Sequence, residues 1–213
     1  MATTAFPSIT PSRSEVGLRY NHSSFTSPLT GQTQTVLRKG ARWGLSMQFD
    51  NLQASERGVL QGFLGYLQGQ VNYVEIGYPA YTGARGALGV SVEVAGADQT
   101  GTQLAIRQTA SGTSTISGFL KAGDLVSFDS GTTKELKMVT ADFDLASGIG
   151  TLAITPPINL SPADAAAIET AAPVGTFMLA GPDLAWSDSG GVLNGSVSLL
   201  SSFSVELMEV LPV

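Results

Sequence analysis

Residues 41–69 have the sequence ARWGLSMQFDNLQASERGVLQGFLGYLQG, which contains the clearest strand and helix patterns in the chain. Between Arg42 and Phe49 every second residue is apolar, and the residues between them are small or polar. A period of two is typical of a β-strand with one buried face, so we predict a half-buried antiparallel strand here. The predicted buried face comprises Trp43, Leu45, Met47 and Phe49.

The residues after this strand predict one helix that packs on it. Apolar side chains recur at an approximately helical spacing from Leu52 to Leu67, with Asp50 and Asn51 as possible N-caps and Gly69 just after the last turn. A helix packed on its own sheet is a commoner cause of such a stripe than a docking face for a partner.

Three glycines, Gly58, Gly62 and Gly65, lie on the opposite side of this helix. Each costs about 0.5–1 kcal/mol relative to alanine, so we expect another backbone to approach the helix closely there. We expect Trp43 and Phe63 to belong to the core, with Trp43 facing the helix.

Shorter alternating runs predict strands on both sides of this segment. The runs Val16–Tyr20 and Gln34–Leu37, together with the Trp43 strand, predict a meander, and Phe203–Leu207 predicts a C-terminal strand.

From about Val92 to Ile158 the chain is rich in Thr, Ser and Gly, and turn sequences separate short apolar runs. Several short strands at this spacing predict a small β-barrel. The runs are Leu104–Arg107, Ile116–Leu120, Leu125–Phe128, Leu136–Thr140 and Gly150–Ile154. A second, short helix is predicted at Ser161–Ala172, because Ser161 can cap it and Pro162 suits its first position.

These patterns predict a mainly β protein: a β-sandwich with one packed helix and an inserted small β-barrel. Because the strands near the two ends of the chain lack partners of their own, we expect residues 1–91 and 173–213 to form one sandwich domain. Residues 92–172 are then the inserted barrel domain.

Composition excludes several classes of function. With no cysteine in 213 residues, the chain has no zinc site of the Cys/His type and no cysteine nucleophile. A net charge of −6 argues against a basic groove that grips nucleic acid. Only 13% of the residues are charged, about half the usual share, so we expect partners to cover much of the surface. No apolar run reaches the roughly 18 residues of a membrane span, and we expect a soluble protein made in a cytoplasm.

Two motifs resemble functional sites, but a structural role is the simpler interpretation of each. Gly148–Ala153 fits a dinucleotide fingerprint, but Pro156 and Pro157 follow at once where a helix is required, so we expect a hairpin turn. Asp142 and Asp144 share one strand face, which does not give the opposed carboxylates that glycoside hydrolysis needs.

The remaining polar residues do not converge on a site. Asp183, Asp188 and the glycines after them lack the spacing of a calcium loop, and we expect an ordinary polar loop. His22 is the only histidine, and we expect it to be a turn residue at the end of a strand. We therefore predict no catalytic, cofactor-binding or metal-binding residue, and no enzyme.

Several segments in a fixed order resemble distal tail proteins of long-tailed (siphovirus-type) bacteriophages. They are Ser24–Gln32, Gly40–Trp43, Leu60–Gln70, Gln99–Gly101, Ala122–Asp124, Pro156-Pro157, Pro173–Phe177 and Ser202–Glu209. The resemblance spans nearly the whole chain and rests on order and spacing, not on one specific motif.

The resemblance implies a tail-tube-like β-sandwich with an added barrel of the oligonucleotide/oligosaccharide-binding type. It implies a structural virion protein: a homo-hexameric ring, assembled in the host cytoplasm, that joins the tail tube protein to the baseplate hub, tip or fibre proteins. DNA would pass through the ring without specific binding, and an acidic ring would let it slide.

Two other functions stay open. A carbohydrate-binding or host-recognition module would need aromatic platforms, but the only aromatics between Val92 and Ile158 are Phe119, Phe128 and Phe143, which we expect in the core. A tail tube subunit would share both the sandwich and the ring.

Overall fold

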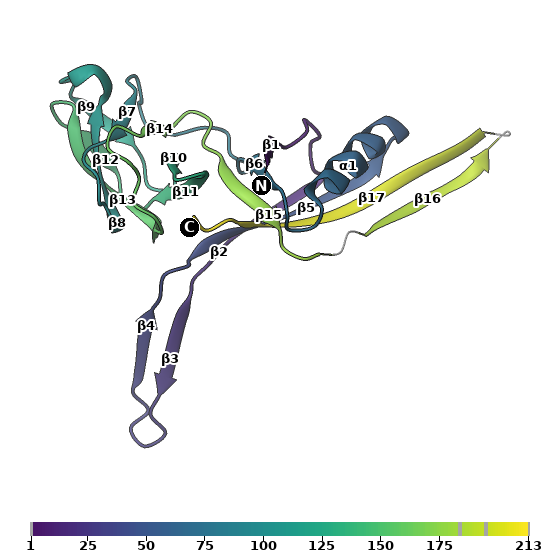
Figure 1. The fold of residues 1–213 in the computed structure, drawn as a ribbon, viewed down its shortest axis with the longest axis horizontal. Helices are drawn as coiled ribbons and strands as arrows, with labels where there is room; N and C mark the ends of the chain where they lie inside the picture. Colours follow the sequence, from purple (N-terminus) through teal and green to yellow (C-terminus); the bar gives the residue numbers. More distant parts are fainter. Residues whose placement is uncertain (1, 183–184, 194–195, 213) are drawn as a thin grey trace. The chain divides into compact units, whose positions relative to one another are not determined.

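The computed structural model describes residues 2–182, 185–193 and 196–212, and these form a mainly β protein with a single α-helix (Figure 1). The fold class predicted from the sequence, a β-sandwich with one helix and a small barrel, is confirmed. The elements are β1 (Thr3–Ala5), β2 (Arg13–Arg19), β3 (His22–Thr26), β4 (Thr33–Leu37), β5 (Arg42–Leu52), α1 (Ala54–Leu67), β6 (Tyr73–Ile76), β7 (Val92–Val94), β8 (Gly101–Gln108), the 3₁₀ turn η1 (Thr109–Ser111), β9 (Ile116–Leu120), β10 (Leu125–Ser130), β11 (Thr133–Val139), β12 (Phe143–Leu145), β13 (Ile149–Ile158), β14 (Ala167–Glu169), β15 (Gly175–Leu179), β16 (Trp186–Leu193) and β17 (Ser196–Glu209).

The chain divides into two compact units. The sandwich unit contains Met1–Gly17, Gly44–Thr82 and Val174–Val210, and the barrel unit contains Leu18–Trp43, Gly83–Pro173 and Leu211–Val213. The chain leaves the sandwich unit after β6 and returns in β15, where Gly175 pairs directly with Ile76. Residues 18–43 thus cluster with the barrel unit. The predicted domain boundaries, 1–91 with 173–213 and 92–172, stay a prediction, which the deletion variant in the Discussion tests.

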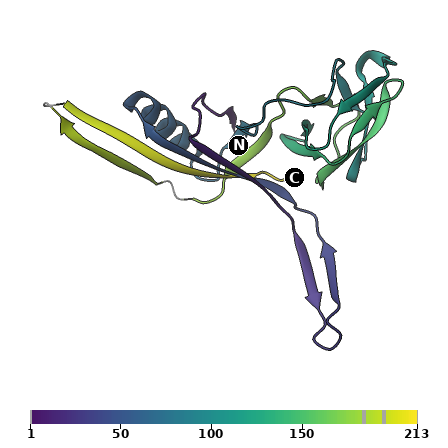
Figure 2. The same ribbon diagram turned by 180° about the vertical axis from the view of Figure 1, so that it is seen from behind.

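The sandwich unit is built on a seven-stranded sheet in the order β1-β6-β15-β17-β5-β2, with β16 paired to β17. Phe49 and Met47 pair with Phe203 and Val205, so one face of β5 and β17 is apolar. The helix α1 lies along these two strands in both views (Figures 1 and 2). Leu60, Leu64 and Leu67 are its buried residues, and the alternation predicted for Arg42–Phe49 is confirmed.

The ends of α1 differ in detail from the prediction. Asp50 and Asn51 belong to β5, and Gln53 is the N-cap, with its backbone N–H donating to Glu56 Oε2 at 3.2 Å. Asn51 has a φ of 58° at a point where the pairing of β5 with β17 shifts, so the chain needs this turn before the helix begins. The helix ends at Gln68, which is left-handed.

The barrel unit contains a closed barrel in the order β10-β11-β13-β8-β7-β14. All five apolar runs predicted between residues 92 and 158 are strands, but β9 pairs with β12 in a separate two-stranded sheet. The buried core of this unit is mainly apolar and contains Val92, Val94, Leu104, Ile106, Phe119, Leu120, Val126, Phe128, Val139, Phe143, Leu145, Leu152, Ile154, Ile158 and Ile168.

The helix predicted at Ser161–Ala172 is wrong. Ala167–Glu169 is β14, which pairs with β7 and β10 and closes the barrel. Ala165 has a φ of 60°, which no right-handed helix permits. Strand pairing in the barrel therefore overrides the helical propensity of the alanines.

The predicted meander is also wrong. Of the strands in that region, β2 pairs with β5 in the main sheet, whereas β3 and β4 pair only with each other. His22 is the first residue of β3 and pairs with Leu37, so it is not a turn residue.

Trp43 is buried, with 6% of its surface exposed, but not in the predicted surroundings. Its Nε1 donates to the carbonyl oxygen of Leu136 in β11 at 2.8 Å, and it clusters with the barrel unit. The 11-residue strand β5 is about 36 Å long. The 14-residue α1 is about 21 Å long, so it covers only part of that strand.

Candidate interaction surfaces

The residues singled out for possible chemistry have structural roles. Ser147 and Gly148 form a turn that leads into β13, as predicted, and Pro156 and Pro157 lie within that strand. Asp144 in β12 accepts hydrogen bonds from the backbone N–H of Gly118 at 2.5 Å and the hydroxyl of Ser117 at 3.3 Å.

Asp142 joins two turns of the barrel unit and does not pair with Asp144. The Ala122 backbone N–H, at 3.0 Å, and the Lys121 ammonium, also at 3.0 Å, hold the pKa of the Asp142 carboxyl below its usual range. Asp144 has different donors, Ser117 and Gly118, so the two carboxylates have separate structural roles.

Asp183 lies outside the described residues. Asp188 in β16 accepts a hydrogen bond from the Ser201 hydroxyl and lies 3.8 Å from the Arg57 guanidinium of α1. Within the part of the chain that the structure describes, no three His, Cys, Asp or Glu side chains come close enough to hold a metal ion. No described helix is long and apolar enough to cross a membrane.

Two further carboxylates tie loops to the barrel. The Arg107 guanidinium first, and then the Gly96 N–H, lower the pKa of Asp164, and Arg107 also binds Glu93 at 2.7 Å. The backbone N–H groups of Ala172 and Ala171 lower the pKa of Glu169.

A buried ion pair lies on β11. Glu135 and Lys137 are both fully buried, and the Lys137 ammonium is 2.5 Å from Glu135 Oε2. Lys137 also donates to the carbonyl of Pro157 at 3.0 Å, and Glu135 accepts from the backbone N–H groups of Asn159 and Leu160 at 3.1 Å each. The pair is enclosed and holds the end of β13 on the barrel, so it is a structural element.

A buried aspartate fixes the segment before β7. Asp124 is 1% exposed and accepts from the backbone N–H groups of Arg85, Gly86 and Lys121 at 2.9, 3.1 and 2.8 Å. A Cβ at Gly86 would lie 2.1 Å from the carbonyl oxygen of Phe119, so only glycine fits this approach. The Asp124 carboxylate is therefore buried and fully hydrogen-bonded within the chain, which makes it a structural group.

Three surfaces have features that contacts within the described residues do not account for. The first is the two-stranded hairpin of β3 and β4, here called the arm (residues 22–37; Figure 1). All ten residues of its strands are exposed. Its exposed large apolar side chains are Phe25, Leu29, Val36 and Leu37, and Leu29 is 95% exposed.

The second surface is the face of the main sheet opposite α1, here called the open face. On β5 and β17 it consists of Gly44, Ser46, Gln48, Asp50, Ser202, Ser204, Glu206 and Met208, which are half-buried or exposed. Asp50 and Glu206 are its carboxylates, and Arg42, the first residue of β5, has the same parity and adds one cation at the end of this face. A sheet face this polar is suited to contact with water or a polar passage.

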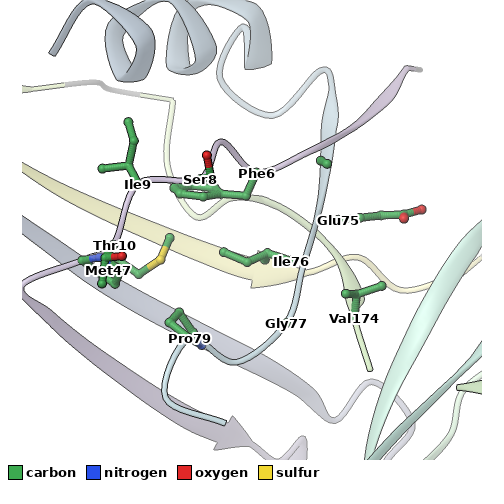
Figure 3. A pocket seen from close by; sticks show the side chains of 12 residues that line it. Phe6, Ser8, Ile9, Thr10, Met47, Glu75, Ile76, Gly77, Pro79 and Val174 are labelled. Atoms are coloured by element: carbon green, nitrogen blue, oxygen red, sulfur yellow. The ribbon is translucent and has the colours of Figure 1, made fainter. Parts of the chain in front are cut away.

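The third surface is an apolar groove in the sandwich unit, with a volume of about 390 Å³. Figure 3 shows Phe6, Ile9, Met47, Ile76 and Pro79 around it, while Glu75 lies at its margin with its carboxylate pointing away. Its other lining residues are Ala5, Ser8, Thr10, Pro11, Gly77 and Val174.

The glycines of α1 do not meet another backbone of this chain. A Cβ at Gly58, Gly62 or Gly65 would find no atom within 4 Å, so the close approach expected from the sequence is absent among the described residues. Val59 and Tyr66 beside them are 54% and 43% exposed. Phe63 is half-buried and packs edge-to-face on Phe6, with ring centroids 5.1 Å apart.

The arm and the groove were missed by sequence reasoning. The arm had a signal: Phe25 and Leu29 stand among serines, threonines and a proline, without the regular apolar alternation of a strand with one buried face. The groove had none, because its walls come from residues 5–11, 47, 75–79 and 174.

Comparison with known proteins adds no assignment: no protein-family model matches this sequence, and no curated protein matches it.

Proposed function

We propose that this chain is a structural ring subunit of a bacteriophage tail, placed at the distal end of the tail tube, where it connects the tube to the hub, tip or fibre proteins. The proposal takes its family from the sequence resemblance to distal tail proteins. Six copies in a ring are the arrangement that this resemblance implies. The protein performs no catalysis in this proposal.

The observation that carries the proposal is the open face of the main sheet. Strands β1 and β2 end the sheet on its two sides, so their outer edges are available for pairing with other copies. A ring of such sheets with the helix outward would turn the open faces toward a central channel. Asp50 and Glu206 would then repel phosphates, which favours sliding of DNA over gripping.

The barrel gives less support to a carbohydrate-binding function. Phe119, Phe128 and Phe143 are 0%, 2% and 9% exposed, so none of them offers a flat aromatic platform for a sugar ring. A tail tube subunit is the second candidate, because the same open face and sheet edges would serve a stack of rings.

The test is the mass of the purified chain by light scattering across the micromolar range, combined with negative-stain images. The proposal expects closed rings with about six copies. A monomer at every concentration, with no ring in the images, contradicts it. Extended tubes built of stacked rings would favour the tube subunit instead.

A further inference from the structure

The arm has no hydrophobic core of its own. It is a two-stranded sheet whose strands pair only with each other, and such hairpins are at best marginally stable in water. Phe25 and Val36 lie on one face, because Phe25 pairs with Gln34 and Val36 pairs with Ser23, two residues along the same strands. Exposed apolar side chains gathered on one element mark an interaction surface.

The arm itself (residues 22–37) contains no Asp, Glu, Lys or Arg, but the residues that flank it are basic. Residues 18–43 contain four basic residues, Arg19, Arg38, Lys39 and Arg42, and no acidic residue. The segments of the sandwich unit contain eight acidic residues and two basic residues. These basic residues at the base of the arm therefore favour its contact with the acidic sandwich unit of a second copy over contact between two arms.

The sandwich unit offers a hollow of suitable chemistry. The groove is walled by Phe6, Ile9, Ile76 and Pro79, and its floor residue Met47 is 1% exposed (Figure 3). An apolar side chain that enters it would be removed from water, which favours binding. Glu75 at the margin adds negative charge near the groove.

We propose that the arm of one copy docks on the sandwich unit of another copy, with the Phe25–Val36 face of the arm over the groove. This proposal rests on the proposed ring and adds to it a contact between neighbouring subunits. A ring needs such a head-to-tail contact between different surfaces of its subunits. It also explains how a hairpin with ten exposed strand residues is stabilised: the neighbour supplies its second layer.

The test exploits the absence of cysteine from the chain. One sample carries Phe25→Cys and the other carries Ser8→Cys, a nearly isosteric change of an exposed residue that lines the groove. The two are mixed under mild oxidation, and disulfide-linked dimers of the two variants are separated by non-reducing electrophoresis and identified by mass spectrometry. The proposal expects this mixed dimer in at least tenfold excess over either homodimer.

The matched control replaces Phe25→Cys by Ile149→Cys, since Ile149 is a 61% exposed apolar residue of the barrel unit outside the arm. This mixture should give no excess of mixed dimer. Equal yields for the two mixtures, or a predominance of Phe25→Cys homodimers, overturn the proposal. Rings in the mass measurement without the mixed dimer refute the arm contact alone, whereas the mixed dimer without rings refutes the ring alone.

A second measurement tests the charge argument with exposed residues at the base of the arm. Arg38→Glu with Lys39→Glu should reduce the yield of the mixed disulfide at least fivefold at low salt. At 1 M salt, where the Debye length is about 3 Å, the reduction should largely disappear. A reduction that does not depend on salt, or none at either salt concentration, contradicts electrostatic guidance of the arm to a second copy.

Discussion

Replacement of Lys137 by methionine gives the sharpest test of how the barrel unit is held together. Lys137 and Glu135 point into the barrel beside Val126 and Phe128, their partners across β10. Both charged side chains are fully buried and 2.5 Å apart. Methionine keeps most of the volume of lysine and removes only the ammonium, so the change isolates the charge.

The expected loss of stability is large. Without the ammonium, the Glu135 carboxylate stays enclosed with no cation, and breaking one partner of a buried pair costs about 3–5 kcal/mol. The Pro157 carbonyl also loses its 3.0 Å donor. For a unit of this size, 1 kcal/mol shifts the melting temperature by about 4 °C, so we expect a decrease of about 12–20 °C in the transition of the barrel unit.

The assay can follow this unit alone. The chain has two tryptophans, and Trp186 belongs to the sandwich unit. In a Trp186→Phe background, the fluorescence of Trp43 reports on β11, because its Nε1 is bonded to the Leu136 carbonyl between the two charged residues. Thermal and urea unfolding are then measured with and without Lys137→Met.

The matched control is Lys121→Met, which removes the ammonium of an exposed pair with Asp142. It should leave the transition almost unchanged, since water screens such pairs. If Lys137→Met shifts the transition no more than Lys121→Met does, the buried pair does not hold the end of β13 and the reasoning is refuted.

Three further predictions test the carboxylates, the domain boundary and the open face. The pKa values of Asp142 and Asp164 are lowered on folding, so their stabilisation is complete above about pH 5 and is lost as the pH falls through the lowered values. Acid titration of the unfolding free energy should therefore be flatter for Asp164→Asn than for the parent chain. Replacing residues 78–173 by an Asn-Gly turn, together with Trp43→Gln, should leave a sandwich unit that unfolds cooperatively by circular dichroism; loss of the transition would show that the two units share one core. Ser204→Lys should leave the mass of the ring by light scattering unchanged if the open face lines a channel, and dissociated subunits would place that face in a contact between copies.

Patterns confined to one element were predictable from the sequence. The alternation in Arg42–Phe49 and the stripe from Leu52 to Leu67 gave β5 and α1, because each element buries one face and its period is set by its own geometry. The barrel strands followed for the same reason. The error at Ser161–Ala172 shows the limit: β14 is a three-residue strand fixed by β7 and β10, and nothing within its own sequence requires it.

The environment of a residue was less predictable than its burial. Trp43 is buried as the alternation predicted, but its partner is Leu136, 93 positions away, and no local pattern encodes that distance. The groove is hidden from sequence reasoning for the same reason. That this chain has no catalytic site stays a prediction, which rests on its single histidine and its lack of cysteine.

The structure shows where the apolar surface predicted from the low charge of the chain lies. A composition with 13% charged residues predicts surplus apolar surface but does not say where it lies. Ten large apolar side chains of the described residues are notably exposed, and five of them, Tyr20, Phe25, Leu29, Val36 and Leu37, fall within residues 18–43. A monomer that scattered such residues would need no explanation. Their concentration in residues 18–43, which include a hairpin without a core and carry four basic and no acidic residues, is the pattern of a surface that is covered after assembly.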